Sequence, residues 1–248
     1  MKRLKKVAVL FVLLNAFIQM PDTSAMTSDS LLIFSPKTTY NYVALFINAK
    51  GDTLSKENIL IKPSGKPWKF DKKQTAFSVS YNYTIEDSLT FLHHINPQTK
   101  KTKKPKQYIW YRYITTGAIE NNEQIWMHPI RDNQYNYTEI APFPSIKLDS
   151  LHNKGTWSNK TIILMGWGAF NGNVTNDYMV VKKEERQYGD LLIDNCWLIQ
   201  SIGEHSKLGK NYLDFYFHAT YGFVEMNYRF YDGTRISFVL SEVNSEIP

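Results

Sequence analysis

The chain has 248 residues, of which 43% are hydrophobic and 15% aromatic, and its formal net charge is +6. Residues 1–25 hold four basic side chains and one acid, so the remainder of the chain is only mildly basic. A mild excess of positive charge gives no reason to expect nucleic acid as a partner. The sequence contains a single cysteine, Cys196, and therefore cannot form an intramolecular disulfide, so the fold must be held by its hydrophobic core.

The N-terminal segment has the three parts of a secretory signal. Basic residues cluster within residues 2–6, an apolar run follows over residues 7–18, and small residues occupy positions 23–25. The apolar run is shorter than the ~20 residues that a membrane-spanning helix needs, and no later run of that length follows. We therefore predict a cleaved signal peptide over residues 1–25 and a secreted or periplasmic protein without a transmembrane segment. The mature part, residues 26–248, is expected to form a single β-rich domain.

Alternation of apolar and polar residues, which is typical of half-buried strands, dominates the rest of the chain. The alternation is strict over residues 76–85. Residues 108–114 are aromatic on both faces and residues 161–167 are continuously apolar, so both are predicted as buried strands. Further strands are predicted over residues 42–47, 58–62, 177–182, 191–202 and 213–217. No long amphipathic helix is found, although a short helix fits residues 85–93. The pattern predicts an all-β, antiparallel fold, built either on a strongly curved sheet (a half-barrel) or as a two-layer β-sandwich.

The last two strands can be placed in register from their apolar faces, because register follows the buried face. A two-residue loop at Asp232–Gly233 would set the apolar face of one strand against the polar face of the other. A three-residue loop, Tyr231–Gly233, keeps the apolar faces together and puts Gly233 at the left-handed position of a G1 bulge. The partners predicted by this loop are Tyr228 with Ile236, Met226 with Phe238 and Val224 with Leu240.

Two connections stand out by their composition. Residues 98–106 contain five lysines and a proline. They are predicted as a solvated loop tip, with contact to anionic envelope polymers as the functional alternative. Residues 121–146 contain prolines at positions 129, 142 and 144, which exclude a central strand over much of the segment. This segment is long for a connection, so we expect it to be either functional or a packed cover for a sheet edge.

Residues 142–248 share an arrangement of turn and core residues with a known group of proteins. In chain order the shared elements are Pro142–Pro144, Gly155–Trp157, Cys196–Trp197, Tyr221–Val224 and Asp232–Gly233. The arrangement resembles uncharacterised exported β-sheet proteins of Bacteroidota cell envelopes. The resemblance implies a long, curved antiparallel sheet and an envelope location, and it implies no catalytic residues.

Signatures of catalysis and of cofactor binding are absent from the sequence, which has no phosphate-binding glycine loop, no GxSxG or HExxH motif and no paired-cysteine zinc site. We accordingly predict no catalytic residue, no metal site and no cofactor. The densest group of polar and aromatic side chains lies within residues 121–146. The candidate ligand-binding residues are Trp126, His128, Arg131 and Tyr135. An acid–base role for His128 would require a carboxylate, from Asp132 or Glu139, close to its ring.

The function predicted from these features is that of an exported, non-catalytic envelope or periplasmic binding protein. Its ligand would be a lipid-like molecule, a glycan or another envelope component, because the chain is rich in aromatic side chains and lacks a catalytic motif. One alternative is a hydrolase that acts on an envelope polymer through His128, and another is a structural interaction subunit. A cavity lined by aromatic residues would favour the binding protein, a histidine–carboxylate contact in a cleft the hydrolase, and a flat exposed apolar face the subunit.

Overall fold

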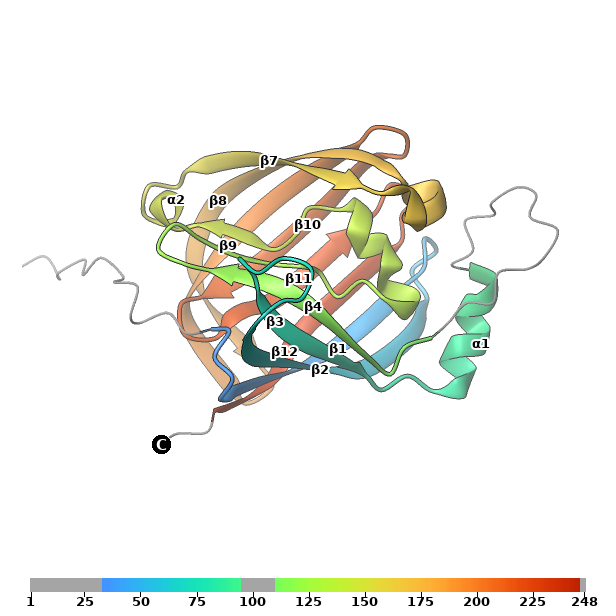
Figure 1. Ribbon diagram of the computed structural model, residues 1–248, viewed down its shortest axis with the longest axis horizontal. Coiled ribbons are helices and arrows are strands. Elements are labelled where there is room, and N and C mark those ends of the chain that lie inside the picture. The colour runs from blue at the N-terminus through green and yellow to red at the C-terminus, as the bar shows by residue number, and fades with distance from the viewer. Residues whose placement is uncertain (1–32, 95–109, 246–248) are drawn as a thin grey trace, which may run out of the picture.

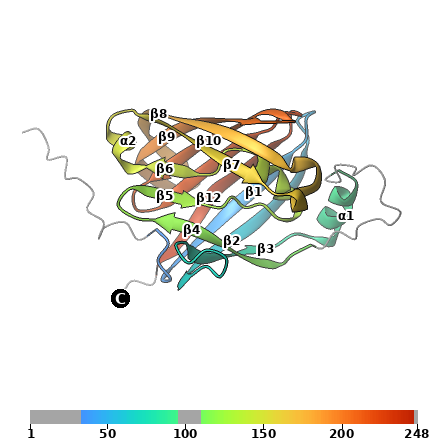
Figure 2. The ribbon, with the colours of Figure 1, turned by 45° about the horizontal axis from the view of Figure 1, so that its top comes forward.

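The computed structural model describes residues 33–94 and 110–245, and its main feature is one antiparallel sheet of twelve strands. The sheet curls into a nearly closed, barrel-like shape (Figures 1 and 2). Within the described ranges, no helix has the length and hydropathy needed to cross a membrane. The predictions of a signal peptide over residues 1–25 and of a lysine-rich tip over residues 98–106 lie outside the described residues.

Most strands are hydrogen-bonded to strands adjacent in sequence, because hairpins connect them. The order across the sheet is β6-β5-β4-β3-β2-β1-β12-β11-β10-β9-β8-β7. The strands are β1 (Thr38–Ile47), β2 (Thr53–Pro67), β3 (Thr75–Tyr81), β4 (Tyr113–Glu120), β5 (Gln124–Met127), β6 (Ser145–Lys147), β7 (Thr156–Ile163), β8 (Gly172–Tyr188), β9 (Leu191–His205), β10 (Gly209–His218), β11 (Gly222–Arg229) and β12 (Arg235–Ser245). The edge strands β6 and β7 follow each other in the chain through the short helix α2 (Leu148–His152), which links the two edges of the curled sheet.

The predicted all-β, antiparallel and strongly curved sheet is confirmed, whereas the two-layer sandwich is not, because all described strands belong to one sheet. The buried side chains of each strand point into the curl and form the core. Phe77 and Val79 on β3 and Leu213 and Phe215 on β10 are examples, each fully buried. Burial of apolar surface at about 25 cal/mol per Å² is the main force that stabilises such a core.

The strict alternation at residues 76–85 predicts a longer strand than the structure contains. β3 ends at Tyr81, and the helix α1 (Ile85–His94) begins four residues later. This helix matches the short helix that fits residues 85–93 in the sequence. Thr84 caps this helix: its hydroxyl accepts a hydrogen bond from Asp87 N (3.0 Å), and the Asp87 carboxylate accepts one from Thr84 N (2.8 Å). This reciprocal capping box satisfies free N–H groups of the first turn and stops the strand.

The strands predicted over residues 108–114 and 161–167 are confirmed only in part, at residues 113–114 and 161–163, and residues 108–109 lie outside the described residues. Residues 110–112 precede β4 and are not part of a strand, and Tyr113, at the start of β4, is exposed. Residues 161–167 divide between the end of β7 and the 3₁₀ segment η3 (Met165–Phe170). Ile163 is buried, but Ile162, Leu164 and Met165 are exposed, Met165 by 86%, because β7 is an edge strand and the chain leaves the sheet after Ile163.

The predicted three-residue loop between β11 and β12 is confirmed. Tyr228 is paired with Ile236, and Met226 with Phe238. Gly233 has φ 86°, a left-handed conformation that glycine adopts without steric cost. The remaining predicted pair, Val224 with Leu240, lies one position beyond the last β11–β12 pair, Glu225 with Val239.

The concave face of the sheet is filled by the chain's own segment 129–144, which we call the interior segment. It contains the 3₁₀ segment η2 (Asn133–Ile140), whose yellow-green turns lie within the curl of the sheet in Figure 1. Its backbone is bound to the sheet from two sides: Asn211 donates to Ile140 O (3.0 Å) and Tyr178 donates to Phe143 O (3.0 Å). The long connection is thus a core element, and its neighbours β5 and β6 extend one edge of the sheet.

The hairpin of β8 and β9 is longer than its neighbours, and its end folds over the outer face. Residues 184–196, which we call the arm, extend beyond the last pair between β9 and β10. Arg186 and Tyr188 of the arm both donate to Glu225 Oε2 on β11, at 2.7 and 2.9 Å. Because β9 and β10 separate β8 from β11 within the sheet, the arm must cross the outer face of β10 to make these contacts. Arg186 lies over β10, with its guanidinium 4.1 Å from the ring centre of Tyr216 on that strand.

Candidate functional site

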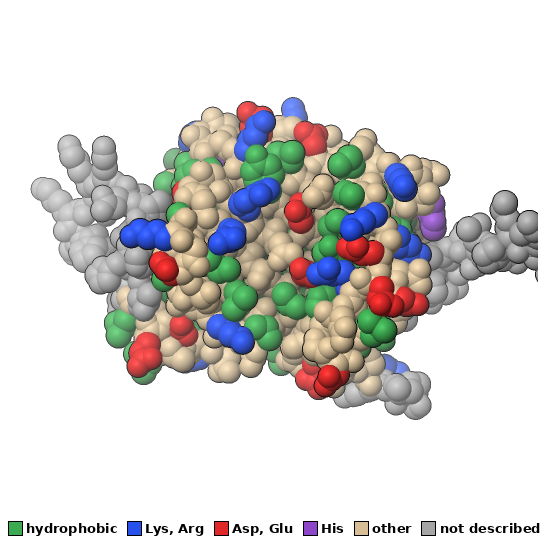
Figure 3. Space-filling model, turned by 180° about the vertical axis from the view of Figure 1, so that it is seen from behind, with side chains coloured by type: hydrophobic (Ala, Val, Ile, Leu, Met, Phe, Trp, Pro, Cys, Tyr) green, Lys and Arg blue, Asp and Glu red, His purple; other side chains and the backbone are tan. Residues whose placement is uncertain are grey.

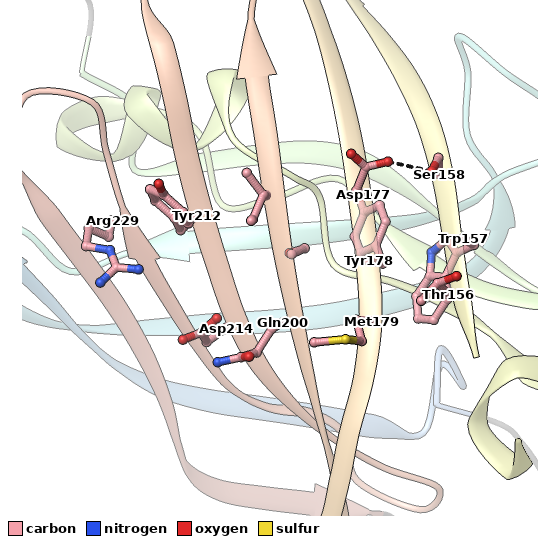
Figure 4. Close-up of a pocket in the computed structure, with 12 residues that line it drawn as sticks. Thr156, Trp157, Ser158, Asp177, Tyr178, Met179, Gln200, Tyr212, Asp214 and Arg229 are labelled. Atoms are coloured by element: carbon pink, nitrogen blue, oxygen red, sulfur yellow. Dashed lines mark hydrogen bonds between the residues drawn. The ribbon is translucent and has the colours of Figure 1, made fainter. Parts of the chain in front are cut away.

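A shallow groove runs across the outer face of β7 to β11. Its side chains alternate along each strand with those of the core and therefore point outward. The hydrogen-bond register places them in two rows across the strands. The first row is Thr156, Met179, Gln200 and Asp214. The second row is Ser158, Asp177, Ile202, Tyr212 and Arg229. Figure 4 shows Asp214, Gln200 and Met179 side by side in the first row.

The two rows border a hollow of ≈ 560 Å³ that opens to solvent. This volume lies within the 300–1,000 Å³ that is common for small-ligand sites. Behind the hollow, Trp157 and Tyr178 stack with ring centres 5.1 Å apart and an interplanar angle of 5°. The stacked rings belong to neighbouring strands and stiffen the floor of the groove at its β7 end.

Charged groups stand at both ends of the groove. Asp177 accepts a hydrogen bond from the Ser158 hydroxyl (2.5 Å), as the dashed line in Figure 4 indicates. Burial raises the pKa of Asp214, an effect that the nearby Arg229 charge opposes. The Arg229 guanidinium lies 4.5 Å from the ring centre of Tyr212, a cation–π geometry that orders both side chains.

Two apolar side chains lie between these polar groups. Met179 is 46% exposed and Ile202 44% exposed, although both sit on central parts of long strands. The space-filling view from behind shows hydrophobic side chains interspersed with charges of both signs over this side of the molecule (Figure 3). The groove thus offers carboxylate acceptors, an amide, a guanidinium donor, a tyrosine ring and an apolar centre within one surface. Such a combination can bind a ligand that has both hydroxyl edges and apolar faces.

Comparison with known proteins gives structural similarity alone. No protein-family model matches the chain, and no curated protein matches it. A solved structure from Bacteroides fragilis, named as an exported protein with a YmcC-like fold, aligns with 85% of this chain and 97% of its own at 8% identity and a TM-score of 0.49. A second, named as a lipoprotein of Parabacteroides distasonis, covers 85% and 98% at 10% identity and a TM-score of 0.37. The first name is that of an exported protein and the second that of a lipoprotein, and both organisms are Bacteroidota.

Two of the four predicted ligand-binding residues, Trp126 and His128, lie together on a different part of the sheet. Their ring centres are 4.6 Å apart, and the His128 ring also contacts Trp68 and Phe143. Burial, with a smaller contribution from the Arg131 charge, lowers the pKa of His128 to about 3. The imidazole is therefore neutral at physiological pH and too weakly basic to accept a proton there. No carboxylate is among the groups that shift this pKa, so the surroundings of His128 give the hydrolase hypothesis no support.

The other two predicted residues have partners of their own. Arg131 donates to Glu139 Oε2 at 2.9 Å, and its guanidinium lies 5.8 Å from the ring centre of Trp167. Tyr135 is fully buried in η2, with its ring centre 5.1 Å from that of Phe238 on β12. A ligand could reach Tyr135 only by displacing part of the core.

The described residues contain no group of three or more His, Cys, Asp or Glu side chains placed to hold a metal ion. The most perturbed acid among them is Glu57, whose carboxyl is buried on β2 and accepts a hydrogen bond from Gln134 of η2 (3.0 Å). Burial raises the pKa of Glu57 to about 7. Because this group faces the packed interior segment, its perturbed pKa belongs to the core rather than to the groove.

Proposed function

We propose that this protein is an exported, non-catalytic binding protein that holds a glycan of the cell envelope in the outer groove. The observation that carries the proposal is the combination, in one hollow of ≈ 560 Å³, of Asp177, Asp214 and Arg229 with the Tyr212 ring and an exposed apolar centre. Sugars present hydroxyl groups at their edges and C–H groups on their faces, and this surface offers partners for both. The export part of the proposal is supported by the signal-peptide pattern of residues 1–25.

A glycan fits the structure better than the lipid-like ligand that a curved sheet could hold in its concave face. The interior segment occupies that face, with Tyr135 and Ile140 fully buried against the strands. A lipid chain would have to replace these contacts, whereas the outer groove is already open. The polar rim of the groove also suits a hydroxyl-rich ligand, because an acyl chain would displace water from the Asp177 and Asp214 carboxylates and offer no hydrogen bond in return.

The proposal can be tested with an array of bacterial envelope oligosaccharides, followed by calorimetry with any glycan that binds. Removal of the ring by Tyr212→Ala should weaken binding about tenfold, since truncation of a central aromatic contact commonly costs more than 1 kcal/mol. The matched control is Tyr113→Ala, which removes an exposed tyrosine from β4, outside the groove. Glycan binding that both variants retain at wild-type strength would contradict the assignment of the groove, and an array without any binding would contradict the glycan.

An interaction subunit is the second candidate, because the β7 edge of the sheet has no strand partner among the described residues. Ile162, Leu164 and Met165 are strongly exposed at the end of this edge. An unpaired edge beside apolar side chains can bind a strand of another protein. Cross-linking in the source cells through a photoreactive residue at position 165 would detect such a partner, and a single partner that requires Ile162 would favour this function over the glycan.

A further inference from the structure

The end of β2 and the connection to β3, residues 66–74, form the most strongly basic surface loop of the described chain. It has the sequence Lys-Pro-Trp-Lys-Phe-Asp-Lys-Lys-Gln, and its four lysines are all exposed. It lies outside the groove, and its contact with the segment that follows β5 is that of the Trp68 ring with the His128 ring (5.2 Å). We call it the 66–74 loop.

The loop has a defined conformation. Trp68 N donates to Gln74 O (2.7 Å) and Gln74 N donates to Asp71 O (3.0 Å), which closes a tight turn around Lys69–Lys73. Trp68 anchors the turn on the outer face of β4: it lies over Gly117, where a Cβ atom would stand 2.9 Å from ring atom Cε3. A larger residue at position 117 would displace Trp68, so the sheet and the loop are fitted to each other.

The charge that the loop presents to solvent is positive. Asp71, its one acid, is turned toward the loop itself: one carboxylate oxygen accepts from Lys73 N (3.0 Å) and the other from the Gln74 side chain (3.1 Å). The four lysines of the loop are therefore presented to solvent without an outward-facing acid from the loop.

A large apolar side chain projects from the centre of this positive surface. Phe70 is 72% exposed, and its contacts are with its own loop: the Trp68 ring at 5.2 Å and the Lys69 ammonium 4.6 Å from its ring centre. Contact of an exposed phenylalanine ring with water is unfavourable. Entry of the ring into an apolar layer is favourable, and anionic groups above that layer would attract the surrounding lysines. Anionic membrane surfaces provide both.

We infer that the 66–74 loop docks the protein on an anionic lipid surface, with Phe70 inserted among the acyl chains and the surrounding lysines bound to the headgroups. A soluble polyanion would pair with the lysines equally well, but it offers no apolar layer for Phe70. The aromatic ring therefore decides between the two classes of partner. The loop lies on β2–β4 and the groove on β7–β11, so membrane docking leaves the groove open and does not depend on its ligand.

The test is co-sedimentation of the purified protein with phosphatidylcholine vesicles that contain about 30 mol% phosphatidylglycerol, beside vesicles of phosphatidylcholine alone. Binding is expected for the anionic vesicles only and should weaken as salt is raised. Phe70→Ala should lower the partition coefficient about tenfold through loss of the inserted ring. Lys72→Ala with Lys73→Ala should lower it about twenty-five-fold, at about fivefold for each lysine near the surface.

The control is Lys50→Ala with Lys210→Ala, which removes the same charge from two exposed sites outside the loop. The inference is overturned if anionic vesicles do not bind the wild-type protein at low salt, or if this control weakens binding as much as the loop variant does. It is also overturned if Phe70→Ala binds as strongly as the wild type, because the contact would then be electrostatic only. Circular dichroism establishes that each variant is folded, which is expected because all substituted side chains are exposed.

Discussion

Glu57 couples folding to pH at the scale of a single residue. Burial raises the pKa of its carboxyl from 4.5 to about 7, an effect that the neighbouring Asp87 enhances and that Gln134 and Arg112 oppose. A carboxyl whose pKa is higher in the folded state binds its proton more tightly there. Its contribution to stability is therefore complete at low pH, decreases as the pH rises from about 4.5 to 7, and stays constant above.

The variant Glu57→Gln should remove this dependence, because an amide keeps the shape of the protonated acid and does not ionise. We expect it to be about 3 kcal/mol more stable than the wild type at pH 8, and close to it at pH 4.5. Urea denaturation at a series of pH values measures the difference. Subtracting the two curves cancels the other buried acids, and Glu242→Gln, at an exposed position, is the control. A difference that does not change between pH 4.5 and 8 would show that Glu57 titrates normally.

One acidic side chain of β11, Glu225, binds two residues of the β8–β9 arm on the outer face. Glu225 is 11% exposed and accepts from Arg186 and from the buried Tyr188. Glu225→Ala leaves both donors without their acceptor, and an unpaired buried polar group costs about 1–3 kcal/mol. We expect the free energy of unfolding to fall by this amount and amide hydrogen exchange to accelerate over residues 184–196.

The control for the arm is Glu204→Ala, which removes an exposed glutamate from β9, outside the arm. It should change neither stability nor exchange by a measurable amount, because exposed single charges contribute little. Faster exchange throughout the sheet in Glu225→Ala, rather than in the arm alone, would mean that the arm does not open as a separate unit.

The elements that could be predicted from sequence are those whose signal is local. The β11–β12 hairpin followed from the spacing of Tyr228, Ile236 and Gly233, and its loop length and register are confirmed. The end of β3 was missed because alternation continues to Ile85, whereas the capping box at Thr84 and Asp87 starts a helix. The signal was present, as a Thr three residues before an Asp, but it competed with a stronger periodic pattern.

Features of the whole molecule depend on contacts between distant residues, and these could not be read from the chain. The prolines of residues 121–146 indicate only that the segment avoids a central strand, and not that it fills the curl of the sheet. The outer groove could not be predicted for the same reason. Alternation along β8 places Asp177 and Met179 on the outer face, but only the pairing of β8 with β9 brings them beside Ile202 and Gln200. Of the candidate residues, Trp126 and His128 are only two residues apart at the end of β5, so their contact is local, whereas Tyr135 lies in the core through contacts with β3 and β12.

The seating of the interior segment on the sheet can be tested at one glycine. At Gly203 on β9, an added Cβ atom would stand 2.9 Å from Pro142 Cδ and 2.7 Å from Asn176 Oδ1. Gly203→Ala therefore forces the interior segment or the sheet to move, and overpacking of this kind costs about 1–3 kcal/mol. The melting temperature should fall by roughly 2–10 °C for a protein of this size. Gly166→Ala is the matched control, because an added Cβ there meets nothing within 4 Å. If both variants have the melting temperature of the wild type, Pro142 is not in close contact with β9. The interior segment would then be held by its hydrogen bonds to Tyr178 and Asn211 instead.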